Sequence, residues 1–253
     1  MNILSSTQIE ILKSCGKKLA ETLFSIEKDL KPGISTKEID NKIESKMAEL
    51  KIRPSFKNYY VHGIGAFPAA TCISINDEIV HGIPSKSRIL KEGDIVSLDL
   101  GAELQGVYTD MAKTYGIGKI SDKAKLLICE TEKSLAKGIE EAVLGNHLGD
   151  VGNAIEKLAK ESGLGVIREY VGHGIGTKPH LPPQIPNYGQ KGSGPAIKEG
   201  MALAIEPMLT LGSEWTKVAK DNWTVHTIDG SLAAHFEHTI IIENGKPVIV
   251  TVV

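Results

Sequence analysis

Two short stretches decide the fold: Lys91–Asp99 (KEGDIVSLD) and Lys198–Glu206 (KEGMALAIE), which lie 107 residues apart. Each begins with Lys-Glu-Gly, continues for five mostly apolar residues and ends in a carboxylate. Short apolar runs bounded by glycine or proline are typical of β-strands. The repeat predicts two α+β halves with a carboxylate at the same place in each, with chance similarity between two such segments as the alternative. Ligand sites often lie at the interface between such halves.

The order of predicted elements around these stretches also repeats. Helical periodicity predicts helices over residues 7–30, about 37–50, 121–143 and about 151–162. Apolar runs predict strands over residues 71–75, 79–80, 94–100 and 107–114, then 165–170, 201–205, 223–227, 238–242 and 247–252. Thr7 with Glu10 is a capping-box pattern that marks the start of the first helix. Residues 1–253 therefore form one predicted domain, with halves at about 7–118 and 119–253.

Composition places the chain among ordinary globular proteins. Of its 253 residues, 41% are hydrophobic and 24% are charged, and the net charge is −2. This balance favours neither nucleic acid nor an anionic membrane as a partner. The three cysteines lack the spacing of a disulfide framework or a zinc site. No apolar run is long enough to span a membrane and the first residues do not resemble a secretory signal, so a cytoplasmic protein is expected.

Four carboxylates stand at or beside the ends of apolar runs. Asp99 and Asp110 flank the turn between two predicted strands, and a hairpin places both on one side of the sheet. An aspartate at such a place is often only a turn or cap residue, but Asp99 lies between two leucines and needs a partner. Glu206 ends an apolar run, and Glu237 precedes one. Together these carboxylates predict a site for two divalent ions.

Histidines with supporting context lie near the same segments. The glycine-rich stretch Glu169–His180 (EYVGHGIGTKPH) carries His173 and His180. Its glycine spacing is not that of a dinucleotide fingerprint, and the prolines that follow exclude the helix that such a motif needs. His81 follows a predicted strand, and His235 is expected to share a strand face with the carboxylate two residues later. An imidazole beside carboxylates suits borderline divalent ions.

Taken together, these motifs resemble type I methionine aminopeptidase over essentially the whole chain. The resemblance rests on VHGIP at 80–84, GDIV at 93–96, GHGIG at 172–176, IEPM at 205–208 and EHT at 237–239, with Asp99 and Asp110. It implies the α+β pita-bread fold, in which two pseudo-twofold related α+β halves surround a central dinuclear metal site. The implied function is removal of the N-terminal methionine from nascent proteins and peptides by two-metal hydrolysis, with a preference for a small second residue.

The resemblance also implies a role for each site residue. Two divalent ions (Co, Mn, Fe or Zn) would be bound by Asp99, Asp110, His173, Glu206 and Glu237. Glu206 would act as general base, His180 would donate to the oxygen of the tetrahedral intermediate, and His81 would hold the amide nitrogen beside the scissile bond. The implied partners are the N-terminal methionine of nascent polypeptides and, transiently, the ribosome. A monomer without membrane contact is expected.

The predicted methionine pocket departs from the family's usual pattern. Cys72 and Trp223 match wall positions of the family pocket, whereas Phe67 stands where a tyrosine is usual. Ile64 and Pro179 occupy positions that are more often aromatic. The predicted pocket is still apolar and contains sulfur, which suits a thioether side chain.

Other interpretations of the sequence stay open at this point. His235 stands where glutamine is usual, and it would hydrogen-bond a ligand, add a ligand or merely replace the amide. An Xaa-Pro aminopeptidase or prolidase of the same fold is one alternative, although such chains usually carry an additional N-terminal domain. A non-catalytic pita-bread protein that binds a partner is another, but such proteins lose metal ligands, and here the whole set is present.

Overall fold

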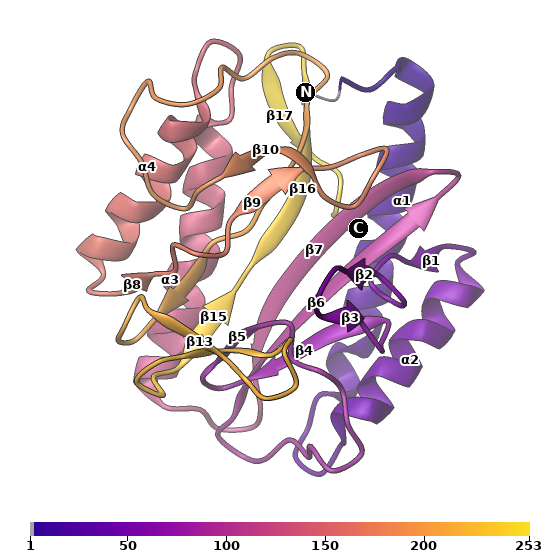
Figure 1. Cartoon of the computed structure of the whole chain (residues 1–253), viewed down its shortest axis with the longest axis vertical. Coiled ribbons are helices and arrows are strands. Elements are labelled where there is room, and N and C mark those ends of the chain that lie inside the picture. Colours follow the sequence, from indigo (N-terminus) through magenta and orange to yellow (C-terminus); the bar gives the residue numbers. More distant parts are fainter. Residues whose placement is uncertain (1–2) are drawn as a thin grey trace.

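The computed structural model describes residues 3–253 and has an α+β architecture (Figure 1). The helices are α1 (Ser6–Ile26), the 3-10 helix η1 (Glu27–Asp29), α2 (Thr36–Glu49), α3 (Asp122–Glu141) and α4 (Leu148–Glu161). The strands before α3 are β1 (Arg53–Pro54), β2 (Tyr60–Val61), β3 (Gly65–Ala66), β4 (Thr71–Ile75), β5 (Glu78–Val80), β6 (Ile95–Leu104) and β7 (Val107–Gly116). Those after α4 are β8 (Gly165–Val166), β9 (Gly172–Gly174), β10 (Leu181–Ile185), β11 (Ala202–Ile205), β12 (Met208–Thr210), β13 (Thr216–Val218), β14 (Val225–Thr227), β15 (Ala233–His235), β16 (Glu237–Glu243) and β17 (Lys246–Ile249).

One large sheet runs through both halves of the chain. Within residues 3–253, nine strands form it in the order β1-β6-β7-β16-β11-β9-β10, with β4 beside β6 and β17 beside β16. Strands β6 and β7 form a long antiparallel hairpin in the first half. Strand β7 also pairs with β16 from the second half, and this pairing joins the two halves. The junction between the two halves is therefore a continuous hydrogen-bonded sheet.

The α-helices cover one face of this sheet. Leu98 and Leu100 of β6 are buried in one cluster with residues of α1 and α2, while Leu203 and Ile205 of β11 are buried in another with residues of α3 and α4. Figure 1 shows these two helix pairs on opposite sides of the molecule. Because side chains alternate along a strand, Asp99 points to the face away from the helices. No helix in the described part of the chain combines the length and apolarity needed to cross a membrane.

The first helix begins earlier than its predicted cap. Ser5 is the N-cap: its Oγ accepts from the Gln8 N–H at 3.4 Å, and Gln8 Oε1 accepts from the Ser5 N–H at 3.0 Å. The capping box predicted at Thr7 is therefore wrong. With the cap at Ser5, Leu4 precedes it and is buried in the cluster against which Ile9 packs. Leu4 and Ile9 thus occupy the two positions of a hydrophobic staple, which favours the earlier start.

The second half contains shorter elements than predicted. Helix α4 begins at Leu148, because the His147 N–H donates to the Asp150 carboxylate at 2.7 Å and caps the helix before Val151. Of the strand predicted over residues 165–170, only β8 is formed. Five short strands of this half lie outside the predicted ranges: β9, β10, β12, β13 and β15.

Candidate metal centre

Strand register brings three carboxylates to one face of the sheet. Asp99 on β6 lies opposite Ala112 on β7, and Glu237 on β16 lies opposite the same Ala112. Asp110 stands two residues before Ala112 and opposite Gly101, so its side chain points to the same face. Oxygen atoms of Asp99, Asp110 and Glu237 accordingly lie within 4.8 Å of one another.

A second group forms around Glu206, which directly follows β11. His173 on β9 lies opposite Ala204 on β11, and its Nε2 is 3.4 Å from Oε1 of Glu206. His173 Nδ1 lies 3.0 Å from the carbonyl oxygen of Gly174, which can only accept, so Nδ1 carries the proton and Nε2 presents a lone pair. Ligand atoms of His173, Glu206 and Glu237 also lie within 4.8 Å of one another.

The two groups share Glu237 and together contain the five predicted metal ligands. Buried oxygens Oδ1 of Asp99, Oδ1 of Asp110 and Oε1 of Glu237 have no hydrogen-bond partner within the described residues. A buried carboxylate oxygen without a partner is costly, and a bound cation removes that cost for several oxygens at once. The donor set of carboxylates with one imidazole therefore fits divalent metal ions.

Burial and mutual repulsion raise the pKa values of this cluster. Burial raises the pKa of Asp99 to about 7. Burial, followed by the nearby carboxylates, raises the pKa of Asp110, Glu206 and Glu237 well above their usual range. Burial lowers the pKa of His173 to about 3, so its imidazole is neutral. Carboxylates this close do not all ionise unless positive charge is bound beside them, which makes the cluster an acceptor for cations.

The cluster lies at the base of a cleft of about 300 Å³. On the wall of this cleft, the rings of Phe67 and Trp223 meet edge to face with centroids 5.2 Å apart. Cys72 on β4 lies opposite Asp99 on β6, so its thiol stands next to the carboxylates. The structure thus brings the three predicted pocket residues, Phe67, Cys72 and Trp223, to the cleft.

The rim of the cleft differs from the sequence-based expectation. Ile64 is 43% exposed and, like Pro179, is not among the lining residues found in the described chain. Tyr59, which directly precedes β2, and Val61, which lies on β2, line the cleft instead. Sequence patterns did not indicate these two residues, because neither belongs to a periodic element or a recognised motif.

His81 stands on the cleft wall in a left-handed backbone conformation, with φ of 60°. The next residue must be Gly82, because a Cβ there would lie 2.2 Å from the carbonyl oxygen of Ile73. The ring of His81 meets the rings of Tyr170 and Trp223 at centroid distances of 5.8 and 6.2 Å. Burial lowers the pKa of His81 to about 4, so a neutral imidazole faces the cleft.

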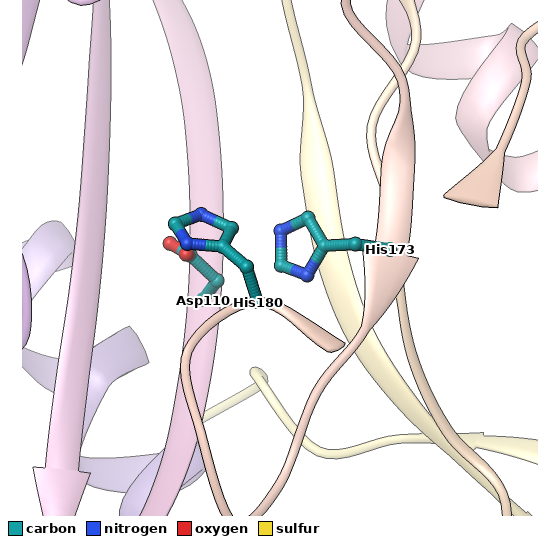
Figure 2. A group of neighbouring side chains, drawn as sticks. All are labelled: Asp110, His173 and His180. Carbon is teal, nitrogen blue, oxygen red and sulfur yellow. The ribbon is translucent and has the colours of Figure 1, made fainter. Parts of the chain in front are cut away.

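His180 comes from the segment between β9 and β10. Figure 2 shows its ring and that of His173 side by side, next to the carboxylate of Asp110. The two ring centroids are 4.6 Å apart, and ligand atoms of all three residues lie within 4.8 Å of one another. His180 Nδ1 lies 3.1 Å from the hydroxyl oxygen of Tyr59. His180 therefore lies beside the carboxylate cluster and contacts Tyr59 at the rim.

The buried side chain of His235 lies close to Glu206. Its Nε2 lies 3.6 Å from Oε2 of Glu206, and its side chain is 1% exposed. Neither ring nitrogen has a hydrogen-bond partner among residues 3–253, and His235 belongs to none of the ligand groups found there. The expectation that His235 and Glu237 share a strand is wrong, because β15 ends at His235 and β16 begins at Glu237.

Comparison with known proteins agrees with this geometry. Residues 10–244 match the model of Metallopeptidase family M24. A methionine aminopeptidase of Clostridium acetobutylicum is 47% identical over 249 residues, which cover 98% of each chain. Methionine aminopeptidase 1 of Bacillus subtilis is 47% identical over 235 residues, which cover 93% of this chain and 92% of that one. The crystal structure of the Thermotoga maritima methionine aminopeptidase matches with a TM-score of 0.96 at 42% identity, with 100% of both chains covered.

A prolidase from Pyrococcus furiosus shares the fold only. Its TM-score is 0.78 at 20% identity, and the match covers 99% of this chain but 65% of the prolidase. These comparisons confirm the predicted pita-bread fold and favour the aminopeptidase interpretation over the prolidase one. The chain belongs to metallopeptidase family M24 and, within that family, to the methionine aminopeptidases.

Proposed function

We propose that this protein removes the N-terminal methionine from nascent proteins and peptides with the help of two divalent ions. The observation that carries this proposal is the pair of ligand groups that share Glu237 beside an apolar cleft. One group is Asp99, Asp110 and Glu237, and the other is His173, Glu206 and Glu237. A carboxylate common to two such groups suits two neighbouring ions, and the donor set suits Co, Mn, Fe or Zn.

Three residues of the cleft have the chemistry that hydrolysis requires. When bound, the ions lower the pKa of a water molecule towards neutrality and polarise the scissile carbonyl. Glu206 accepts the proton of the attacking water and passes it to the leaving amine. His180, at the rim, donates a hydrogen bond to the oxygen of the tetrahedral intermediate. His81, held in its left-handed conformation on the wall, positions the amide nitrogen beside the scissile bond.

The wall of the cleft supports methionine as the first residue. Phe67, Cys72 and Trp223 are apolar or weakly polar, and Phe67 and Cys72 are 2% and 4% exposed. A thioether is polarizable and unbranched, so it makes favourable contacts with aromatic rings and fills an irregular slot. A charged first residue would lose hydration beside this apolar wall, which offers it no charged partner.

The remaining features of the proposal concern the cellular setting. We propose that residues 1–253 act as one catalytic domain and as a monomer in the cytoplasm. There the protein would bind nascent chains during a transient contact with the ribosome. The single domain is supported by the sheet, which continues from β7 to β16 and builds the cleft from both halves. The proposed contact with the ribosome rests on the nature of the substrate alone.

Steady-state hydrolysis by protein reconstituted with each candidate metal tests the proposal. Met-Ala-x peptides should be cleaved after the first residue, and exhaustive treatment with a chelator should abolish this activity. Ala-Pro-x and Arg-Pro-x peptides of the same length serve as the comparison. Faster cleavage of these peptides, or full activity in metal-free protein, would overturn the proposal.

A further inference from the structure

The rim of the cleft contributes a tyrosine that contacts His180 directly. The Tyr59 hydroxyl oxygen lies 3.1 Å from His180 Nδ1, and the two rings meet edge to face with centroids 5.1 Å apart. Tyr59 directly precedes the β2–β3 hairpin and lines the cleft. The two residues are 121 positions apart in the sequence, so the contact is a product of the fold.

The partners of the two neighbouring imidazoles differ in kind. His173 Nδ1 faces the carbonyl of Gly174, which only accepts, and this fixes the lone pair of His173 on Nε2. His180 Nδ1 faces a hydroxyl, which both donates and accepts. A phenol is a better hydrogen-bond donor than acceptor, and an imidazole lone pair is a strong acceptor. The favoured hydrogen bond is therefore the one in which the Tyr59 hydroxyl donates and Nδ1 of His180 accepts.

His180 also lies beside the carboxylate cluster, because ligand atoms of Asp110, His173 and His180 lie within 4.8 Å of one another. The contact with Tyr59 occupies Nδ1 of His180, so Nε2 is the ring nitrogen that Tyr59 leaves free. A neutral imidazole has one N–H, so a lone pair on Nδ1 leaves the proton on Nε2.

We propose that Tyr59 is a positioning residue, which donates its hydroxyl hydrogen bond to Nδ1 of His180 and so holds His180 as the Nε2–H tautomer. This inference rests on the proposed function, in which His180 donates to the oxygen of the tetrahedral intermediate. Only the Nε2–H tautomer can donate from the nitrogen that Tyr59 leaves free. Tyr59 thus acts through His180 and does not itself touch the reacting atoms.

The tautomer of His180 can be measured without any turnover. We would record nitrogen-15 spectra of the imidazoles in protein loaded with zinc, which is diamagnetic, and assign His180 by the signals missing from His180→Ala. The wild-type protein should show a protonated Nε2 and an unprotonated Nδ1. Tyr59→Phe, which keeps the ring but removes the hydroxyl, should shift His180 towards a mixture of tautomers. A protonated Nδ1 in the wild-type protein, or an unchanged tautomer in Tyr59→Phe, would overturn the proposal.

Kinetics of a double-mutant cycle provide the second test. His180→Ala should lower kcat by roughly 10²–10³-fold, the usual effect of losing one donor to such an oxygen. Tyr59→Phe should lower kcat by roughly tenfold with KM within about twofold, as expected when a partner that orients a working residue is lost. In the His180→Ala background the same change should have no further effect, because Tyr59 acts through His180.

The neighbouring Tyr60 supplies the matched control. Its side chain is 68% exposed and outside the residues that line the cleft, so Tyr60→Phe should leave kcat and the tautomer of His180 unchanged. Multiplicative losses of kcat from Tyr59→Phe and His180→Ala would show that Tyr59 acts independently, contrary to the proposal. A wild-type protein that fails to cleave Met-Ala peptides would contradict the proposed function. The tautomer measurement needs no turnover, so it tests the hydrogen bond from Tyr59 to His180 separately.

Discussion

Asp110 is buried and lies close to two further carboxylates, Asp99 and Glu237. Asp110→Asn keeps the shape of the side chain and removes its charge. We expect it to abolish activity and to lower the amount of metal retained after dialysis. Without metal, the variant should melt at the same temperature as the wild-type protein or higher, because repulsion within the buried cluster is relieved. Metal analysis and thermal unfolding with and without metal measure both effects.

Asp122 offers the matched control for this substitution. It lies in the first turn of α3 with its side chain 98% exposed, so Asp122→Asn should retain full metal content and activity. An Asp110→Asn variant that retains metal and turns over normally would show that Asp110 is not a ligand. A metal-free Asp110→Asn variant that is clearly less stable than metal-free wild type would instead show that Asp110 supports the fold.

His235 approaches Glu206 and belongs to no ligand group in the described chain, which favours a place beside a ligand over direct coordination. His235→Gln introduces the residue usual in the family. We expect its activity to stay within about tenfold of wild type and its metal affinity to be retained, because the change alters only the surroundings of a ligand. Metal titration and steady-state kinetics measure the two quantities. Complete loss of metal binding would show that His235 coordinates an ion.

Strand β9 determines where His173 stands, and its two glycines allow the neighbouring strands to approach. A Cβ on Gly174 would lie 2.6 Å from the carbonyl oxygen of Pro182, and one on Gly172 would lie 2.4 Å from that of Ala204. Gly174→Ala should therefore displace β9, destabilise the protein by about 1–3 kcal/mol as overpacking does, and weaken metal binding through His173. Urea unfolding and metal titration measure these effects.

Gly189 is the control for the effect of an added methyl group. A Cβ at Gly189 would lie 3.2 Å from the carbonyl oxygen of Gly149, away from the site, so Gly189→Ala requires a smaller adjustment. It should change metal affinity little. If Gly174→Ala were as stable and bound metal as tightly as wild type, β9 would have enough freedom to move, and the close approach would not explain its glycines.

The longer elements were predictable from sequence because their periodicity is local. The repeat of Lys91–Asp99 in Lys198–Glu206 predicted the strands that carry Asp99 and lead to Glu206, and both strands are formed. Strand β9 was not predicted, since Gly-His-Gly has no alternation of apolar and polar residues and becomes a strand only by pairing with β10 and β11. The contact of Tyr59 with His180 was equally beyond sequence patterns, because it joins a rim loop to a distant segment.

For the molecule as a whole, the decisive feature is that both halves build one cleft. The first half supplies Cys72, Asp99 and Asp110 from β4, β6 and β7, and the second half supplies His173 and Glu237 from β9 and β16. The sheet joins the halves where β7 pairs with β16, so the two ligand groups meet at this junction. Register between the strands therefore sets the distance between the groups more strictly than any loop would.

The same cleft leads to our prediction for substrate choice. Phe67, Cys72 and Trp223 form an apolar wall beside the carboxylates, so methionine should be accepted as the first residue and a charged first residue should be rejected. Peptides that begin with norleucine should also be cleaved, with a kcat/KM about 10–200-fold below that of the methionine peptides. This is the range expected for a small change in an apolar group. In line with the family resemblance, Met-Gly, Met-Ala and Met-Ser starts should be cleaved, and Met-Lys and Met-Phe starts spared. Values of kcat/KM for a panel of peptides that differ in the first and second residues measure this pattern. Efficient cleavage after a first-residue lysine, or before a second-residue phenylalanine, would contradict it.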